Sequence, residues 1–449
     1  MVVRFHPNSD ALLTPASHSN SPVQMIYVTS PKLPPCGKPA ILVVPQFFVK
    51  KLTGRLCLRR QNFFVGSIEF RLGASPAGQR DVFPSRSDRW FVIFHDLRYA
   101  WLLRNSSFSF SAEQPAMPVA LITPEEMISN PGPEAQILRE AGFDVRYPAD
   151  TTFTRGLGTE DETIRTLRGA NASIAGGEWL TEKVFAAVPE LRVVARAGVG
   201  YDRVDIAAAA RHGVVVTITP TANHAAVAEH TLALLFGVTR QIAISDRTMR
   251  AGQWIRRRLL PVRGRTMGLV GLGRIGRSTA VRCIALGMKV IAYEVKPDTA
   301  FVQQHGIELA SFEALLKQSD FVSLHCPLSE ETRGLMNAAA FAKMKPGSLF
   351  INTARGGLVV EADLIAALQS GHLGGAGLDV FEKEPPDPKN ALFQMDQVVV
   401  TPHVGGGDTQ SIADMGAEAA RCIVALSRGE WPDGAVVNDS LKSGWRWSR

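Results

Sequence analysis

From Met117 onward, short apolar runs alternate with segments whose apolar residues lie three or four positions apart. The first pattern is typical of buried strands and the second of helices. Between residues 117 and 220 it predicts strands at 119–123, 144–147, 172–175, 191–196 and 214–218. The helices between them are predicted at 133–141, 163–167, 182–188 and 204–211. This alternation indicates a parallel, doubly wound α/β sheet.

A long helix and a second α/β unit follow. One continuous helix is predicted at 223–250, and its largely apolar surface indicates burial between domains or subunits. Further strands are predicted at 267–270, 289–293, 321–325, 348–353, 376–380 and 398–401, with helices between them, and a last helix at 411–427. The fold class is therefore α/β, with two doubly wound parallel sheets.

The first 116 residues do not share this pattern. They hold 15 of the 34 aromatic residues and show no sustained period of 2 or 3.6. They carry 14 Lys and Arg against 6 Asp and Glu, whereas the other 333 residues carry 35 against 36. We expect residues 1–116 to lie outside the working protein, with Met117 as its start. A targeting peptide and a small accessory domain are the alternatives.

Composition excludes several classes of protein. The excess positive charge belongs to the first 116 residues, so no nucleic-acid partner is expected for the main body. The longest apolar runs, such as residues 40–49, are too short to span a bilayer, so no membrane partner is expected. Five scattered cysteines form no disulfide or metal pattern. They indicate a reducing compartment, and we expect the cytoplasm and no metal.

A glycine-rich turn follows the predicted strand 267–270. Its residues are Gly271, Leu272, Gly273, Arg274, Ile275 and Gly276, and a helix is predicted to run from there to Leu286. The three glycines permit a tight turn, a close approach to a pyrophosphate and close helix–strand packing. Glu294 lies 18 residues past the last glycine, where a carboxylate binds ribose hydroxyls and repels a 2′-phosphate. The pattern predicts a dinucleotide site that favours NAD over NADP, although nearby Lys296 weakens the preference.

Reactive residue types follow three of the later predicted strands. Arg355 comes after strand 348–353, Asp379 and Glu384 come at or after strand 376–380, and His403 comes after strand 398–401. Because ligands of open α/β sheets bind beyond the carboxyl ends of the strands, these side chains are expected to converge. A histidine changes charge near neutral pH and is suited to proton transfer.

Six motifs in this order resemble the D-isomer-specific 2-hydroxyacid dehydrogenase family, from about residue 117 to 434. Within the family, the phosphoglycerate dehydrogenase branch is the most similar. The motifs are Ala195-Arg196-Ala197-Gly198-Val199-Gly200-Tyr201-Asp202, Val227-Ala228-Glu229-His230, Gly271 to Gly276, Asn352-Thr353-Ala354-Arg355-Gly356-Gly357, Leu378-Asp379-Val380-Phe381 through Glu384-Pro385, and Pro402-His403-Val404-Gly405-Gly406.

The resemblance implies an organisation and a set of roles. A cofactor domain at 221–403 would be inserted into a flavodoxin-like substrate domain at 117–220 and 404–449, and dimers would form through the cofactor domain. His403 would take the proton of the substrate hydroxyl, Glu384 would orient the imidazole, and Arg355 would bind the substrate carboxylate. The expected substrate-binding residues are Gly198, Val199, Gly200 and Arg355. Besides the glycine-rich turn and Glu294, the expected cofactor-binding residues are Cys326, Pro327, Thr353, Ala354, Asp379, His403, Gly405 and Gly406.

Other residues are given structural roles. Asp202 and Asp205 are expected to cap the following helix. His224, His230, His325 and His372 are expected to be structural or surface residues, and Cys326 a packing residue rather than a nucleophile.

The substrate stays open at this point. A phosphoglycerate is favoured, with Arg196, Arg240 and the arginines at 256–258 as candidates to bind its phosphate. Hydroxypyruvate or glyoxylate reduction is the alternative, and an NAD-sensing protein similar to the C-terminal-binding corepressors is an alternative of another class. Formate is disfavoured because Glu384 stands where the formate enzymes carry an amide. The chain ends soon after helix 411–427, so feedback by serine through a further C-terminal domain is not expected.

Overall fold

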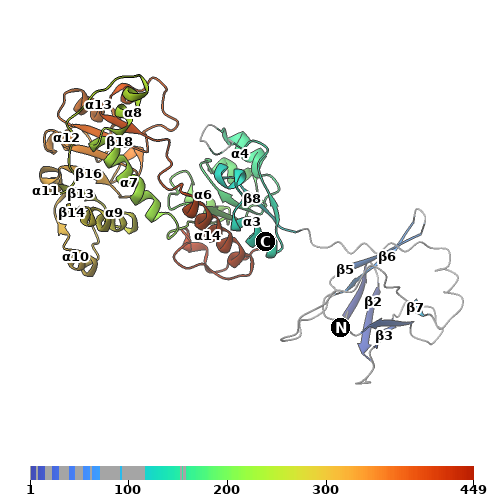
Figure 1. Cartoon of the computed structure of the whole chain (residues 1–449). Helices are drawn as coiled ribbons and strands as arrows, with labels where there is room; N and C mark the ends of the chain where they lie inside the picture. Colours follow the sequence, from blue (N-terminus) through green and yellow to red (C-terminus); the bar gives the residue numbers. More distant parts are fainter. Residues whose placement is uncertain are drawn as a thin grey trace. The chain divides into compact units, whose positions relative to one another are not determined.

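The computed structural model divides the chain into two units, Met1–Ala116 and Met117–Arg449 (Figure 1). In the first unit it describes the backbone of residues 2–6, 9–15, 23–29, 40–45, 54–60, 63–70 and 92–93. In the second unit it describes residues 117–151, 154 and 158–448. Each unit is considered separately.

The described part of the first unit is an antiparallel sheet with the strand order β5-β6-β1-β2-β3-β4-β7. Sequence patterns predicted no regular elements here, so this sheet is an addition to the predicted fold. Its strands are β1 (Val2–His6), β2 (Ser9–Pro15), β3 (Val23–Thr29), β4 (Ala40–Pro45), β5 (Gly54–Arg60), β6 (Phe63–Phe70) and β7 (Val92–Ile93).

The second unit begins with a five-stranded parallel sheet of order β12-β11-β10-β8-β9, which we call the substrate lobe. Its strands are β8 (Val119–Ile122), β9 (Asp144–Arg146), β10 (Ala172–Ala175), β11 (Val193–Arg196) and β12 (Val215–Thr217). Its helices are α2 (Glu125–Ser129), α3 (Pro133–Glu140), α4 (Glu160–Leu167), α5 (Glu182–Ala187) and α6 (Ile206–Arg211).

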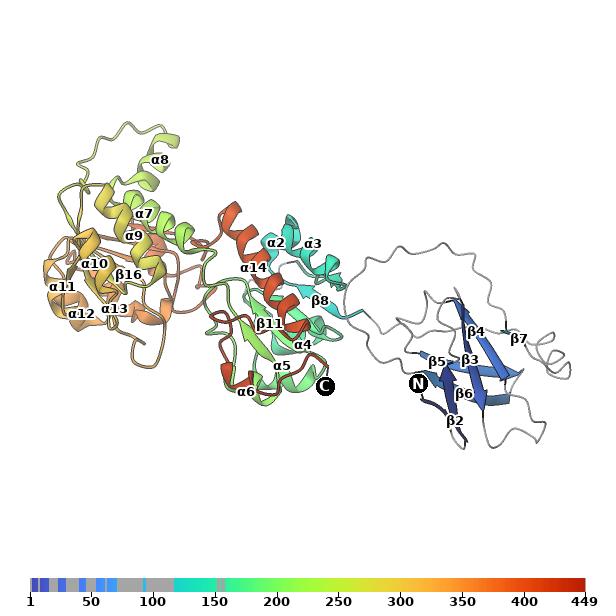
Figure 2. The same cartoon turned by 90° about the horizontal axis from the view of Figure 1, so that it is seen from below.

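Alternate residues of these strands pack on opposite faces, as the doubly wound pattern predicts. On β11, Val193 and Ala195 join the apolar cluster that contains α3, whereas Val194 joins the cluster formed with α4, α5 and α6. The last helix, α14 (Thr409–Ser427), returns to the substrate lobe and buries Met415 and Ile423 in the first cluster. Figure 2 shows α14 beside α2 and α3. The predicted return of this helix is therefore confirmed.

The segment after α14 covers the edge of β12. Ile218 donates a backbone hydrogen bond to Ala435, and Val437 donates one to Val216, each at 2.9 Å. The buried Asn438 side chain accepts from the amide of Val216 at 2.9 Å. This pairing satisfies backbone groups that an open edge strand would leave exposed.

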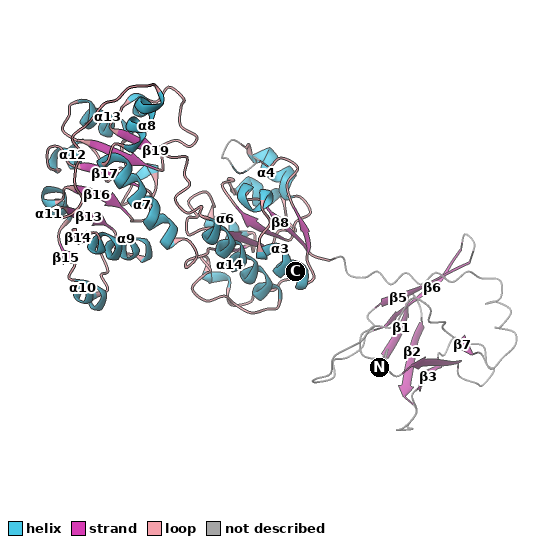
Figure 3. Ribbon diagram, in the orientation of Figure 1, coloured by secondary structure: helices cyan, strands magenta, loops and turns pink. Residues whose placement is uncertain are grey.

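A seven-stranded parallel sheet of order β15-β14-β13-β16-β17-β18-β19 forms the second half of this unit, the cofactor lobe (Figure 3). Its strands are β13 (Thr266–Val270), β14 (Lys289–Tyr293), β15 (Glu308–Leu309), β16 (Phe321–Leu324), β17 (Leu349–Asn352), β18 (Gly375–Leu378) and β19 (Val398–Val400). Its helices include α9 (Arg274–Ala285), α10 (Thr299–His305), α11 (Phe312–Gln318), α12 (Ala338–Lys343) and α13 (Glu361–Gln369). The chain reverses direction across the sheet between β13 and β16, which is where doubly wound sheets bind ligands.

The predicted helix at 223–250 is wrong as a single element. The structure has α7 (His224–Thr239) and α8 (Ile242–Arg250), separated at Gln241, whose φ of 51° and ψ of 41° are left-handed. Helix α7 is apolar on most sides and largely buried, as predicted, but α8 buries no residue. No glycine or proline marks the break, so sequence patterns could not locate it.

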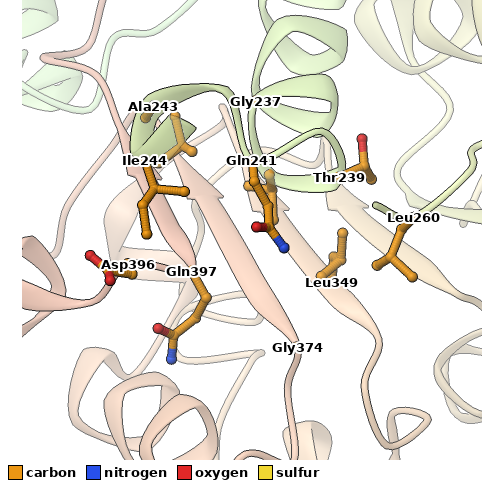
Figure 4. Close-up of a pocket in the computed structure, with 12 residues that line it drawn as sticks. Gly237, Thr239, Gln241, Ala243, Ile244, Leu260, Leu349, Gly374, Asp396 and Gln397 are labelled. Atoms are coloured by element: carbon orange, nitrogen blue, oxygen red, sulfur yellow. The ribbon is translucent and has the colours of Figure 1, made fainter. Parts of the chain in front are cut away.

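A pocket of about 190 Å³ lies at this break (Figure 4). It is lined by residues of α7, α8, β17 and the segment before β19, including Gln241, Ile244 and Gln397. None of the predicted site residues lines it. No helix in the described part of the chain combines the length and apolarity that crossing a bilayer requires.

Candidate functional site

The glycine-rich turn after β13 has the geometry that a bound pyrophosphate needs. Gly271 has a φ of +102°, and a Cβ there would lie 2.7 Å from the backbone of His325. A Cβ on Gly276 would lie 2.3 Å from the carbonyl oxygen of Gly271, so the third glycine allows α9 to pack on the turn. Gly273 caps α9 with no side-chain hydrogen bond, and a Cβ there would meet nothing within 4 Å. Open space in front of the first amides of α9, at Arg274 and Ile275, suits a phosphate group.

Glu294 lies beside this turn at the end of β14. Its Oε2 accepts from the amide of Leu272 at 2.7 Å, and its Oε1 accepts from the amide of Lys296 at 3.0 Å. Burial alone would raise the pKa of Glu294, but these backbone hydrogen bonds hold it below its ordinary value. The carboxylate is therefore ionised and fixed beside the glycine-rich turn, where a ribose would lie.

Other predicted cofactor residues follow the neighbouring strands. Cys326 and Pro327 come after β16, and burial raises the pKa of the Cys326 thiol to about 11. Such a thiol is not a nucleophile at neutral pH, in agreement with a packing role. Thr353 and Ala354 come after β17. The Thr353 hydroxyl hydrogen-bonds that of Thr231 on α7 at 2.9 Å. These residues share the carboxyl edge of the sheet with the glycine-rich turn.

His403 and Glu384 form a hydrogen-bonded pair. His403 Nδ1 lies 2.8 Å from Glu384 Oε2. The other ring nitrogen, Nε2, has no hydrogen-bond partner in the described residues, and 45% of the His403 side chain is exposed. Burial alone would raise the pKa of Glu384, but the hydrogen bond and charge of His403, the amide of Phe381 and the charge of Arg203 lower it. The pair thus offers a free imidazole nitrogen backed by an ionised carboxylate.

Arg355 reaches across to the substrate lobe. Its Nε donates to Asp202 Oδ1 at 2.8 Å, and its Nη1 donates to the carbonyl oxygen of Ala354 at 2.7 Å. A Cβ on Gly200 would lie 1.5 Å from Arg355 Nη2, so any other residue here would displace this guanidinium. Burial alone would raise the pKa of Asp202, but Arg355 lowers it.

The prediction for Asp202 is therefore wrong in part. Asp205 caps α6 as predicted, because its Oδ1 accepts from the amide of Ala208 at 2.8 Å. Asp202 caps no helix and pairs with Arg355 instead. Local spacing could not distinguish these two acids, because the partner of Asp202 lies 153 residues away.

The turn formed by Gly198, Val199 and Gly200 lies next to Arg355. The amide of Gly198 donates to the Thr219 hydroxyl at 2.8 Å, so it is not free to bind a substrate. The amides of Val199 and Gly200 have no acceptor in the described residues. Two of the three predicted amides are thus available to an added carboxylate.

Asp379 holds the loop that carries His403. Its Oδ1 accepts from the Thr401 hydroxyl at 2.6 Å and from the amide of Val404 at 2.9 Å, and its Oδ2 accepts from the amide of Gly405 at 2.8 Å. His230 also lies 3.3 Å from Asp379 Oδ1. Since Asp379 is 1% exposed, these contacts occupy the carboxylate that was predicted to contact the cofactor.

Close backbone packing explains the glycines of this loop. A Cβ on Gly405 would lie 2.8 Å from Asp379 Oδ2, and one on Gly406 would lie 2.9 Å from Asn223 Nδ2.

Arg196 and Arg203 lie at this edge of the substrate lobe near Arg355, and sequence reasoning missed Arg203. Arg203 Nη2 lies 3.3 Å from Glu384 Oε2. Arg196 donates from Nε to the carbonyl oxygen of Gly200 at 3.1 Å, and its buried Nη1 has no hydrogen-bond partner in the described residues. The other candidate arginines, Arg240 and those at 256–258, make no hydrogen bond or ion pair with Arg355, Glu384 or His403 in the described part of the chain.

Replacement of Asp379 with Asn tests its role in the loop. Burial alone would raise the pKa of Asp379, but His230, Thr401 and the two amides hold it below its ordinary 3.8. A lowered folded-state pKa stabilises the fold above pH 4, and this contribution is lost as the pH falls through the folded value. Asp379→Asn should lower the free energy of unfolding at pH 7 by about 2 kcal/mol. Urea unfolding should show a smaller difference at pH 3.5.

The exposed Asp246, paired with Arg250 on α8, is the matched control, because its replacement with Asn should change little at either pH. An equal loss for Asp379→Asn at both pH values would contradict the assigned role.

Comparison with known proteins extends these observations. Residues 232–405 match the family model described as D-isomer specific 2-hydroxyacid dehydrogenase, NAD binding domain. A D-3-phosphoglycerate dehydrogenase from Mycobacterium leprae is 46% identical over 267 residues, which are 58% of this chain and 50% of the relative. A glyoxylate reductase from Korarchaeum cryptofilum is 37% identical over 266 residues, which are 58% of this chain and 80% of the relative. The chain spans about half the length of the phosphoglycerate dehydrogenases that it matches.

Solved structures agree. The TT0316 protein from Thermus thermophilus is 34% identical and superposes with a TM-score of 0.63 over 71% of this chain and 100% of its own. A D-lactate dehydrogenase from Aquifex aeolicus, solved with NAD and lactic acid, is 27% identical, with a TM-score of 0.62 over 71% of this chain and 99% of its own. These similarities agree with the two parallel-sheet lobes, the glycine-rich turn and the order of the motifs. The chain belongs to the D-isomer specific 2-hydroxyacid dehydrogenase family, whose NAD-binding domain it carries.

Proposed function

We propose that the protein is an oxidoreductase that transfers a hydride between C2 of a D-2-hydroxy acid and NAD. The observation that carries the proposal is the pair of His403 and Glu384, with His403 Nε2 unpartnered in the described residues. Gly356 brings the two catalytic loops together, because a Cβ there would lie 1.8 Å from the carbonyl oxygen of Phe381. Arg355, one residue earlier, thus comes from a loop that packs against the one leading to Glu384.

The residues present define each step of the oxidation. The substrate carboxylate binds the Arg355 guanidinium through Nη2, which has no hydrogen-bond partner in the described residues, and accepts hydrogen bonds from the amides of Val199 and Gly200. His403 Nε2 accepts the proton of the C2 hydroxyl as the C2 hydride leaves. Glu384 stabilises the imidazolium that forms. The bound nicotinamide supplies the hydride acceptor, and the products are a 2-oxo acid, NADH and a proton.

A phosphoglycerate is the substrate that we propose first, which would place the reaction in serine biosynthesis. The identity to phosphoglycerate dehydrogenases supports it. Glyoxylate or hydroxypyruvate reduction is the second candidate, and the glyoxylate reductase that the chain matches over 80% of its length favours it. Initial rates with D-3-phosphoglycerate, glyoxylate and hydroxypyruvate, followed as NADH absorbance, separate the two.

We propose that the chain has the domain boundaries that the family resemblance implies. Residues 117–220 and 404–449 form the substrate domain and 221–403 the cofactor domain, with residues 1–116 outside the catalytic unit. A cytoplasmic location is proposed on the free thiols of Cys283, Cys326 and Cys422, which suit a reducing compartment.

We also propose that the protein is a homodimer formed through the cofactor lobe. Large apolar side chains are exposed together on α8 and on the segment between α8 and β13. They are Ile242, Met249, Trp254, Ile255, Leu259 and Leu260. A second copy of the chain would bury this surface, which we call the apolar arm, and exposed apolar surface is typical of interfaces.

Replacement of the catalytic side chains should abolish turnover but preserve cofactor binding. His403→Ala removes the proton acceptor and Arg355→Ala removes the carboxylate ligand, so each should lower kcat/KM by roughly 10²- to 10⁴-fold. The dissociation constant for NADH, measured by fluorescence, should stay within about threefold of wild type. His305→Ala, on α10 and stacked on Phe301, is the matched control and should retain activity. Near-wild-type rates for His403→Ala would refute the proposed chemistry.

The choice between NAD and NADP should depend on Glu294. Glu294→Ala removes the carboxylate that would bind the ribose hydroxyls and repel a 2′-phosphate, so NADH should bind roughly tenfold more weakly. NADPH binding should be unchanged or stronger. Titration of both cofactors measures the ratio, and Glu331→Ala, an exposed acid of the same lobe, should leave it unchanged. An unaltered ratio of the NADH and NADPH dissociation constants in Glu294→Ala would mean that another residue distinguishes the two cofactors.

A charge in the apolar arm should dissociate the dimer. Trp254 is 75% exposed, and Trp254→Asp would place an unpaired charge in the proposed interface. The mass from light scattering at micromolar concentration should fall from that of a dimer to that of a monomer. Leu309→Asp, on the edge strand β15, is the control and should stay dimeric. A monomeric wild-type protein would contradict the proposal.

A further inference from the structure

Two neighbouring residues of the substrate lobe each contact a catalytic residue of the cofactor lobe. Asp202 and Arg203 follow β11, and they carry opposite charges. Asp202 pairs with Arg355 at 2.8 Å, and Arg203 pairs with Glu384 at 3.3 Å. The charges of one short loop therefore complement those of two catalytic side chains across the boundary between the lobes. The proposed function gives a role to Arg355 and Glu384 but none to Arg203.

Arg203 is held in place by its own lobe. Its Nη1 donates to the carbonyl oxygen of Gly177, and its guanidinium lies 5.5 Å from the centre of the Trp179 ring. A Cβ on Gly177 would lie 3.3 Å from Arg203 Nη1 and 2.2 Å from the backbone oxygen of Thr154, so it is the Thr154 backbone that requires glycine here. Only 18% of the Arg203 side chain is exposed, so its guanidinium is held in place and its Nη2 can donate to Glu384.

That Nη2 reaches the same carboxylate oxygen that binds the catalytic imidazole. Glu384 Oε2 accepts from Arg203 at 3.3 Å and lies 2.8 Å from His403 Nδ1, while Oε1 accepts from the amide of Phe381 at 3.2 Å. The Glu384 carboxylate is thus fixed by its own loop on one oxygen and by both lobes on the other. A carboxylate held at both oxygens orients the imidazole more narrowly than one held only by the histidine.

We propose that Arg203 is a positioning residue of the catalytic centre, which holds Glu384 from the substrate lobe so that contact between the lobes completes the proton-accepting pair. The proposal rests on the proposed dehydrogenase function and adds a residue that acts through Glu384 without touching the substrate. It also couples the two lobes, because Glu384 loses this hydrogen bond whenever the substrate lobe moves away.

Charge gives the proposal a measurable consequence. Arg203 places a cation beside the pair, which disfavours a second positive charge on the imidazole. The other charged or titratable groups around the pair are Arg355 and its partner Asp202, buried Arg196, and Asp379 with His230 behind the His403 loop. None of these other groups forms an ion pair with Glu384 in the described residues, whereas Arg203 contacts it directly.

The test compares Arg203→Met, which removes the charge and keeps the length, with Arg203→Lys, which keeps the charge. Arg211→Met is the matched control, because Arg211 pairs with Glu182 on the surface of the same lobe. Turnover is measured against pH for the full chain, together with NADH affinity. The titration of the His403 ring is followed by NMR with ¹³C-labelled histidine and assigned with His403→Ala, so that one readout needs no turnover.

In Arg203→Met, protonation of the pair becomes easier. The acid limb of kcat/KM for oxidation and the His403 titration should both move up by about 0.5 to 1 pH unit. The value of kcat should fall roughly tenfold, and NADH affinity should not change. Arg203→Lys should restore the wild-type acid limb and most of kcat, and Arg211→Met should match wild type throughout.

An acid limb and titration unchanged in Arg203→Met would overturn the proposal even if kcat fell, since a purely structural role predicts that result. A failure of Arg203→Lys to restore the limb would also overturn it. If Arg203→Met does not fold, Arg203→Gln takes its place with the same expected shift. Absence of turnover in the wild-type protein would instead refute the proposed function, and the NMR titration would still decide whether Arg203 acts on the pair.

Discussion

The hydrogen bond between His403 Nδ1 and Glu384 Oε2 is the interaction on which the rest of the site depends. It fixes which nitrogen of the imidazole faces the open side, and it requires Glu384 to stay ionised although that side chain is only 19% exposed. Burial opposes ionisation, so the carboxylate needs several donors to remain charged. The chain supplies them from the Phe381 amide, from His403 and from Arg203, which come from both lobes.

The backbone geometry of His403 follows from the same requirement. Its φ of 55° lies in the left-handed region, which is unfavourable for residues other than glycine. Asp379 offsets this cost: its backbone oxygen accepts from the His403 amide at 2.8 Å, and its carboxylate accepts from the two following amides. A buried acid that was predicted to contact the cofactor therefore builds the loop that carries His403.

Sequence patterns predicted the parts of the structure that depend on local periodicity. The parallel strands of both lobes and the glycine-rich turn follow from apolar runs and glycine spacing within a few residues, whereas the return of α14 was implied by the family resemblance. The break at Gln241 was missed because no local residue type marks it. Arg203 was missed for a related reason, since its partner Glu384 lies 181 residues away and only the folded chain brings them together.

The glycines of the motifs show what sequence patterns cannot predict. A glycine spacing indicates where backbone must come close to something, but not to what. Gly273 faces open space, as a phosphate site requires, whereas Gly200 makes room for the guanidinium of Arg355. That guanidinium donates from Nε to Asp202 and from Nη1 to Ala354, whereas its Nη2 and the neighbouring amides of Val199 and Gly200 have no partner in the described residues. These directed donors, rather than net charge, would bind the carboxylate of a small acid, since Asp202 already balances the charge of Arg355.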